Sequence, residues 1–249
     1  MQESLGGGDE SVVAGAAALV CTLLSARRDE AAPALLALLQ QQCAAPAQSL
    51  AAALGAQAAQ AASLPAGQPL PCTALGHALD ADAVMHALGV CAYDMHDCLR
   101  FDDWCRAALL PLLAATPPPE LASAVAAAAG AAAARAGSGD GGAALALSVL
   151  RRRSLWLLRC WMADLTDELR PALLEQLGRL LSGGGEASVD PGVRLSAIAA
   201  VQALVDDMAF KPAMLLPTLR PMLDGLWAAA SALRSLEARQ QVVRPLARD

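Results

Sequence analysis

The feature that most constrains this fold is a sharply delimited amphipathic helix that is predicted to begin at Pro191. Asp190 stands where a helix N-cap accepts a backbone N–H, and Pro191 takes the first helical position, where a missing N–H costs nothing. Apolar residues then recur at spacings of three and four residues: Val193, Ala197, Ile198, Ala200, Val201, Leu204 and Val205. So wide an apolar face must be covered from more than one side, which predicts a stack of helices.

Two further helices are predicted immediately before this one. The first spans Ser148 to Ala163. Its inward face carries large apolar residues at helical spacing: Leu150, Leu157, Leu158 and Trp161. After a short polar link, Pro171 stands in the first turn of the second helix, which is predicted to end near Leu181 at the glycines 183–185.

The order of these signals is typical of HEAT repeats. Pro171 marks the first turn of one helix, and Asp190, Val193 and Arg194 open the next helix after a tight link. The sequence therefore predicts an all-α fold, a HEAT-repeat α-solenoid of stacked antiparallel helix pairs. In such a stack, we expect Trp161 and Val193 to be buried between adjacent repeats.

The composition agrees with an all-α fold. The chain has 249 residues, of which 56% are hydrophobic but only 3% aromatic, and Ala and Leu dominate. Both are strong helix formers, whereas the residues that favour strands are scarce. The net charge of −6 argues against general nucleic-acid binding, which needs a basic surface.

The pattern divides the chain into three parts. Residues 1–115 are predicted to form N-terminal helical repeats, and residues 143–249 the HEAT repeats described above. Between them, residues 116–142 read as an Ala/Gly/Pro-rich low-complexity insertion, helical only through Ala131 to Arg135 and otherwise flexible. No signal peptide or membrane-spanning run is recognised, so no membrane insertion is predicted.

The candidate chemistry favours a protein that is not an enzyme. The seven cysteines lie in apolar helical faces, which predicts reduced, buried thiols: Cys21, Cys43, Cys72, Cys91, Cys98, Cys105 and Cys160. His86 and His96 lie near three of them, but zinc sites use close pairs such as C-x-x-C, so no metal site and no cofactor is expected. No catalytic triad order, nucleophile elbow or phosphate-binding loop is present.

Two clusters of charge are candidate partner-binding surfaces. Arg151, Arg152, Arg153 and Arg159 lie on one predicted helix, where Arg152 and Arg159 share a face that could bind acidic segments of a cargo. The alternative is an exposed face that pairs with acids such as Glu168 and Asp206. The second cluster is acidic and suits either a basic peptide or helix capping: Asp94, Asp97, Asp102 and Asp103.

Three segments resemble the importin-beta (karyopherin) superfamily. The first runs from Gly89 to Pro111 and contains Phe101-Asp102-Asp103-Trp104. The second joins Leu150-Arg151-Arg152-Arg153-Ser154-Leu155-Trp156 to Leu169-Arg170-Pro171. The third runs from Val193-Arg194 through Val205-Asp206-Asp207-Met208 to Leu216-Pro217. The matched segments correspond to the middle of such receptors, so the resemblance implies that this chain is a segment of a longer one.

The resemblance implies a nuclear transport receptor that carries protein cargo, contacts nuclear pore proteins and is regulated by the small GTPase Ran. Cytoplasm, nucleus and nuclear envelope are the implied locations. The N-terminal repeats that contact Ran have no counterpart here, so weak or absent Ran binding is expected for this chain alone. Arg151, Arg152, Arg153, Arg159, Asp206 and Asp207 are the candidate partner-binding residues. The alternatives are an exportin-type receptor and a HEAT scaffold of a multiprotein complex.

Overall fold

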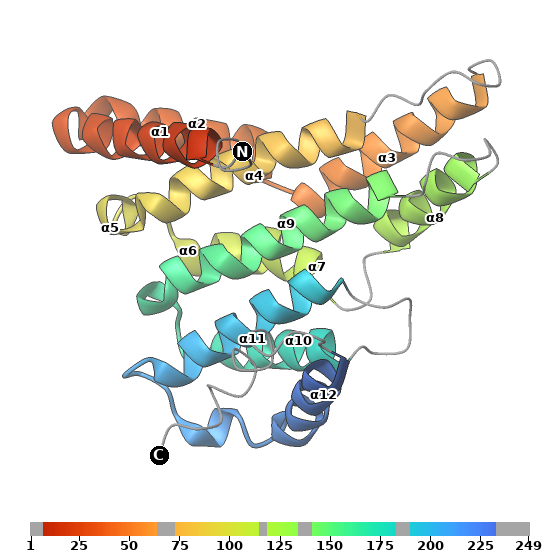
Figure 1. Ribbon diagram of the computed structural model, residues 1–249. Coiled ribbons are helices and arrows are strands. Elements are labelled where there is room, and N and C mark those ends of the chain that lie inside the picture. Colours follow the sequence, from red (N-terminus) through yellow and green to blue (C-terminus); the bar gives the residue numbers. More distant parts are fainter. Residues whose placement is uncertain (1–6, 64–72, 115–118, 134–140, 183–189, 233–249) are drawn as a thin grey trace, which may run out of the picture.

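The computed structural model describes residues 7–63, 73–114, 119–133, 141–182 and 190–232, and within these ranges every regular element is a helix (Figure 1). The first half contains α1 (Gly7–Ala26), α2 (Arg28–Cys43), α3 (Pro46–Ser63), α4 (Thr73–Val90), α5 (Ala92–Met95), α6 (Phe101–Trp104) and α7 (Leu110–Leu113). The second half contains α8 (Pro119–Ala133), α9 (Gly141–Cys160), α10 (Arg170–Ser182), α11 (Pro191–Asp206) and α12 (Leu219–Ala232). The described residues confirm the predicted all-α class.

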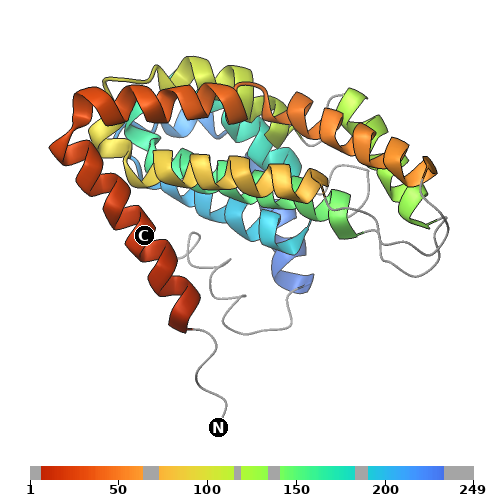
Figure 2. The ribbon, with the colours of Figure 1, turned by 90° about the horizontal axis from the view of Figure 1, so that it is seen from above.

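The helices stack in two rows. In one row α4 packs on α9 and α9 on α11, and in the other α3 contacts α7, α7 contacts α10, and α10 contacts α12. Pairs such as α3 with α4 and α10 with α11 join the rows. Figure 2, which looks along the stack, shows α4, α9 and α11 lying one behind the other. This is the layered arrangement of an α-solenoid, as the sequence predicts.

The predicted start of α11 is confirmed in detail. Asp190 is the N-cap residue, and its Oδ1 accepts a hydrogen bond of 3.1 Å from the backbone N–H of Val193. Pro191 is the first helical residue, and Pro171 likewise stands in the first turn of α10. Arg194 lies in the first turn of α11, where its backbone N–H bonds to the Asp190 carbonyl. The Asp190 cap and the two first-turn prolines mark where α10 and α11 begin.

The low-complexity segment contains more helix than the sequence predicts. Residues 119–133 form α8, whereas helix was expected only from Ala131 onward, and Arg135 lies outside the described residues. α8 packs on α3, with Leu121 and Ala128 buried. An alanine run has a high helix propensity, and its small side chains let two helices approach closely. The three-part division of the chain stays a prediction.

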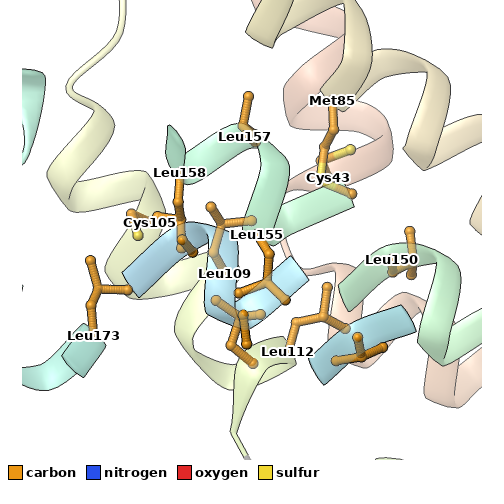
Figure 3. Close-up of a cluster of buried hydrophobic side chains, with 14 of the residues drawn as sticks. Cys43, Met85, Cys105, Leu109, Leu112, Leu150, Leu155, Leu157, Leu158 and Leu173 are labelled. Atoms are coloured by element: carbon orange, nitrogen blue, oxygen red, sulfur yellow. The ribbon is translucent and has the colours of Figure 1, made fainter. Parts of the chain in front are cut away.

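The core lies between the two rows and is built mainly from leucine. Figure 3 shows leucines of α7, α9 and α10 converging with Cys43, Met85 and Cys105. Trp161, just after α9, has no exposed surface, and its ring stacks on Phe101 with centroids 4.8 Å apart. Its Nε1–H donates to the Leu88 carbonyl oxygen at 3.3 Å. Val193 is also buried, so the predicted burial of both residues is confirmed.

Candidate partner-binding groove

A groove of about 590 Å³ crosses the row formed by α4, α9 and α11. Its charged and polar lining residues are Asp82, Arg152, Arg153, Arg159 and Ser196. Its larger apolar lining residues, which we call its floor, are Leu79, Val149, Trp156, Leu195 and Ala199. Three arginines and one aspartate give it a net positive lining, in contrast to the negative chain. We call this feature the basic groove. It combines charge with apolar surface, as protein-recognition sites do.

Arg153 is held at one side of the basic groove by three partners. Its Nε and Nη2 donate to the two carboxylate oxygens of Asp82 at 2.7 and 3.1 Å, a bidentate pair between α9 and α4. Its Nη1 lies 2.8 Å from Nδ1 of His86, and its guanidinium carbon lies 4.9 Å from the ring centroid of Trp156. Arg153 therefore orients the side of the groove and is engaged within the chain.

His86 and Trp156 complete this arrangement. Their ring centroids are 5.1 Å apart. Partial burial and the nearby charge of Arg153 lower the pKa of His86 below its usual 6.5, against the opposing effect of Asp82. The neutral imidazole then accepts the hydrogen bond from Arg153 through Nδ1. His86 serves here to fix Arg153.

Arg152 and Arg159 provide the exposed positive charge of the groove. Both side chains line it and both residues are exposed, so the predicted shared face on α9 is observed. Within the described residues, neither Arg152 nor Arg159 forms an ion pair with Glu168. Nε of Arg152 also lies close to Gly192, at the N-terminal turn of α11. These two guanidinium groups are the ones that a ligand can reach.

Arg151 differs from the exposed position that the sequence predicts. Only 7% of its surface is exposed, and it points to the other side of α9. Its Nε donates to the Leu112 carbonyl at 3.0 Å and its Nη2 to the Ala114 carbonyl at 2.6 Å, which satisfies the end of α7. Burial lowers the pKa of this guanidinium from its ordinary value. Arg151 therefore joins two helices and is not part of the groove.

The two acidic candidates, Asp206 and Asp207, do not line the basic groove. Asp207 forms an ion pair with Arg170, which is 2% exposed and also donates to the carbonyls of Leu165 and Met162. Asp206 is exposed at the end of α11 and lines a different pocket, between α11 and α12. The structure does not bring these carboxylates to the four arginines. Asp207 has a structural contact that sequence spacing did not reveal.

Most of the cysteines that the structure describes are buried or half-buried within the helical stack. Cys43, Cys91 and Cys105 are buried as predicted, but the prediction of burial is wrong for Cys98, which is exposed near Arg28. Cys72 lies outside the described residues. Sγ of Cys21 lies 3.9 Å from Sγ of Cys91, yet no three metal-ligating side chains come together in the described part of the chain.

The acidic cluster makes contacts within the chain. Asp97 pairs with Arg28, and Asp103 pairs with Arg100 at 2.9 Å. Asp102 accepts from the backbone N–H of Thr166 at 3.1 Å and also from its hydroxyl. Asp102 therefore fixes the link after α9 to α6, which is a different role from the predicted helix cap.

Sequence reasoning missed Asp82, which lines the groove, and His86, which holds Arg153 beside it. Asp82 and His86 are four residues apart on α4, so they share a helix face that contacts α9 only after folding. Trp156 was assigned to the family resemblance but not to a site. The available signal was the spacing of Arg152, Trp156 and Arg159, which places all three on one face of α9.

Comparisons with known proteins agree with this architecture. The chain is 26% identical to human Importin-11 and 25% identical to mouse Importin-11, in each case over 166 residues, which is 66% of this chain. The matched part spans only 14% of the length of these relatives. No family model matches the chain. No solved structure matches it either. Among the described residues, no helix is long and apolar enough to cross a membrane. The relatives and the all-helical stack together confirm the resemblance of this chain to the importin-beta superfamily.

Proposed function

We propose that this chain is a protein-binding segment of an importin-like nuclear transport receptor. The similarity to Importin-11 over 166 residues is the observation that carries the proposal. The two-row helical stack supports it, because solenoids present extended surfaces on which partners dock. The proposed partners are protein cargo, nuclear pore proteins and, for the full-length receptor, the GTPase Ran. The proposed locations are the cytoplasm, the nucleus and the nuclear envelope. The proposed role involves no catalysis by this chain.

Ran binding is proposed to be weak or absent for this chain alone. Solenoid receptors wrap their partners, so their affinity is summed over contacts from distant repeats. The exposed ion pairs that Arg152 or Arg159 could form contribute only about 0–1 kcal/mol each. A titration with Ran bound to a non-hydrolysable GTP analogue tests this. Submicromolar, nucleotide-dependent binding would contradict it.

The decisive experiment follows entry into the nuclear pore, because a static HEAT scaffold has no reason to enter it. The full-length receptor that contains this chain is fused to a tandem of fluorescent proteins too large to diffuse through the pore and is added to permeabilised cells. The fusion should concentrate at the nuclear envelope and reach the interior, while the tandem alone stays outside. Exclusion of both proteins would reject the transport role and favour a scaffold.

Direction of transport separates the importin from the exportin alternative. In the importin reading, Ran in its GTP form releases cargo from the complete receptor, whereas in the exportin reading it strengthens cargo binding. A cargo captured by the full-length receptor and then challenged with GTP-bound Ran distinguishes the two. Release of the cargo supports the proposal, and tighter retention supports the exportin reading.

A further inference from the structure

We propose that the basic groove binds a short acidic peptide segment of a protein partner, with carboxylates at Arg152 and Arg159 and an apolar side chain beside Trp156. The inference deepens the proposed function because it names the chemistry that one surface recognises. It also stands as a binding claim that can be tested without transport.

The electrostatic argument starts from the two exposed guanidinium groups. Arg153 is already neutralised by Asp82, so the uncompensated charge of the groove comes from Arg152 and Arg159. Two arginines seven residues apart lie about two helical turns, roughly 10 Å, from each other along α9. An extended peptide covers that distance in about three residues. Alternate side chains of an extended peptide point to the same face, so carboxylates two or four residues apart, about 7 or 13 Å, lie on either side of this distance and can meet both arginines.

The N-terminus of α11 borders the basic groove beside Arg152. Gly192 stands in its first turn and borders the groove, and the aligned peptide dipoles of a helix place partial positive charge there. A side chain at position 192 would come within 3.4 Å of Cδ and Nε of Arg152. Glycine therefore lets Arg152 lie against the helix end. The N-cap carboxylate of Asp190 also lies at this helix end, with its Oδ1 2.9 Å from that Cβ position and already bonded to the Val193 N–H, so the positive charge of the groove comes from Arg152 and Arg159.

The floor of the groove indicates that the ligand is not purely charged. Leu79, Trp156 and Leu195 line it from α4, α9 and α11. Its volume of about 590 Å³ is within the usual range of ligand sites, roughly 300–1,000 Å³, and exceeds what a single carboxylate needs. An acidic segment with one apolar residue uses both kinds of surface.

Charge elsewhere on the chain favours a short peptide over a nucleic acid. The net charge is −6, so a long polyanion that extends beyond the groove meets repulsion from the rest of the chain. A short acidic segment is attracted by the groove and is not long enough to reach the negatively charged surface beyond it. The basic groove is thus a small positive site on an acidic protein.

The experiment measures binding of a fluorescein-labelled peptide, Gly-Glu-Leu-Glu-Glu-Leu-Glu-Gly, to the whole chain by fluorescence anisotropy at low salt. Binding should weaken as salt rises, because exposed ion pairs are screened. The double variant Arg152→Glu/Arg159→Glu should raise Kd at least tenfold, and Arg152→Lys/Arg159→Lys should keep most of the affinity. A peptide with serine in place of leucine should bind several-fold more weakly.

The matched control is Arg106→Glu/Arg220→Glu, which makes the same change in net charge at two exposed arginines outside the groove. Its Kd should change less than twofold. An equal loss in both double variants, unchanged binding in the groove variant, or no binding of the peptide would each overturn the inference. Tighter binding of a ten-nucleotide oligo-dT than of the peptide would assign the groove to nucleic acid instead.

The outcome is separable from that of the transport proposal. Peptide binding with the expected variant profile, combined with exclusion from the nuclear pore, would support the groove and reject the receptor role. Pore entry without peptide binding would do the reverse.

Discussion

Arg170 and Asp207 form an ion pair that joins the first residue of α10 to the residue that follows α11. Arg170 is almost fully buried, while the Asp207 side chain is 19% exposed. The two residues belong to segments that resemble the importin-beta superfamily separately, Leu169-Arg170-Pro171 and Val205-Asp206-Asp207. The pair thus closes the α10–α11 hairpin at the end opposite its connecting loop.

Removing the acid should leave a buried positive charge. Asp207→Asn should lower the free energy of unfolding by about 2–4 kcal/mol, because Arg170 keeps only its carbonyl acceptors. Urea denaturation measures this change. Asp103→Asn is the control, since its pair with Arg100 is largely exposed and should change stability by less than about 1 kcal/mol. Equal effects in the two variants would refute a buried role for Asp207.

Trp161 should be among the most important side chains for stability. Trp161→Ala removes the stack on Phe101 and the hydrogen bond to Leu88, and should cost about 3–5 kcal/mol. Trp227→Ala, at a residue that is 78% exposed, should stay within about 0.5 kcal/mol of the parent chain. Thermal and urea unfolding report both values. A loss well below 1 kcal/mol for Trp161→Ala would mean that the helix faces are assigned wrongly.

Gly225 lets the backbone of α12 lie close to the end of α10. A Cβ built there would lie 2.6 Å from the Leu181 carbonyl carbon and 2.8 Å from the Ser182 nitrogen, and both atoms are backbone. Gly225→Ala should therefore destabilise the chain by about 1–3 kcal/mol through overpacking. Gly76→Ala, in α4, meets nothing within 4 Å and should stabilise the chain by about 0.5–1 kcal/mol. Chemical denaturation should therefore give changes in the free energy of unfolding of opposite sign for the two variants, and equal signs would contradict the α10–α12 contact.

The thiols should differ widely in reactivity. Burial raises the pKa of Cys43, Cys91 and Cys105 to about 12, so these thiols stay protonated at pH 8, where the thiolate is the reactive form. Cys98 is exposed. Brief treatment with iodoacetamide at pH 8, followed by mass spectrometry, should find Cys98 modified well before those three. Comparable early labelling of Cys43 would contradict the packing of α2 on α4.

Several features of the fold could be predicted from local sequence. Helix α11 begins where the N-cap and proline rules place it, because Asp190 and Pro191 act on backbone groups within their own turn. The burial of Trp161 and Val193 followed from the spacing of apolar residues along one helix face. The helix α8 was underestimated because a run of alanines carries little amphipathic pattern, so its packing on α3 left no clear trace in sequence.

The candidate site was predicted only in part. The helical period alone places Arg152 and Arg159 on one face of α9, and the structure finds both in the basic groove. The same reasoning could not show that Arg151 turns inward to the carbonyls at the end of α7, or that Asp207 meets Arg170. Spacing defines an angle around one helix, but it does not say which neighbouring helix lies at that angle.

The sequence by itself determined the helical class, the capped start of α11 and most of its buried face, since these depend on residues within a few turns of one another. It did not determine the start of α9, which lies at Gly141 and not at the predicted Ser148, or the exposure of Val205 on α11. Only the tertiary structure decided which charges remain available. Asp82 and His86 reach Arg153 from α4, and Gly192 reaches Arg152 from α11, across sequence separations of 40 residues or more. The physical reason is that an arginine is satisfied by whatever acceptor packing brings near it, and packing between helices is a property of the whole stack.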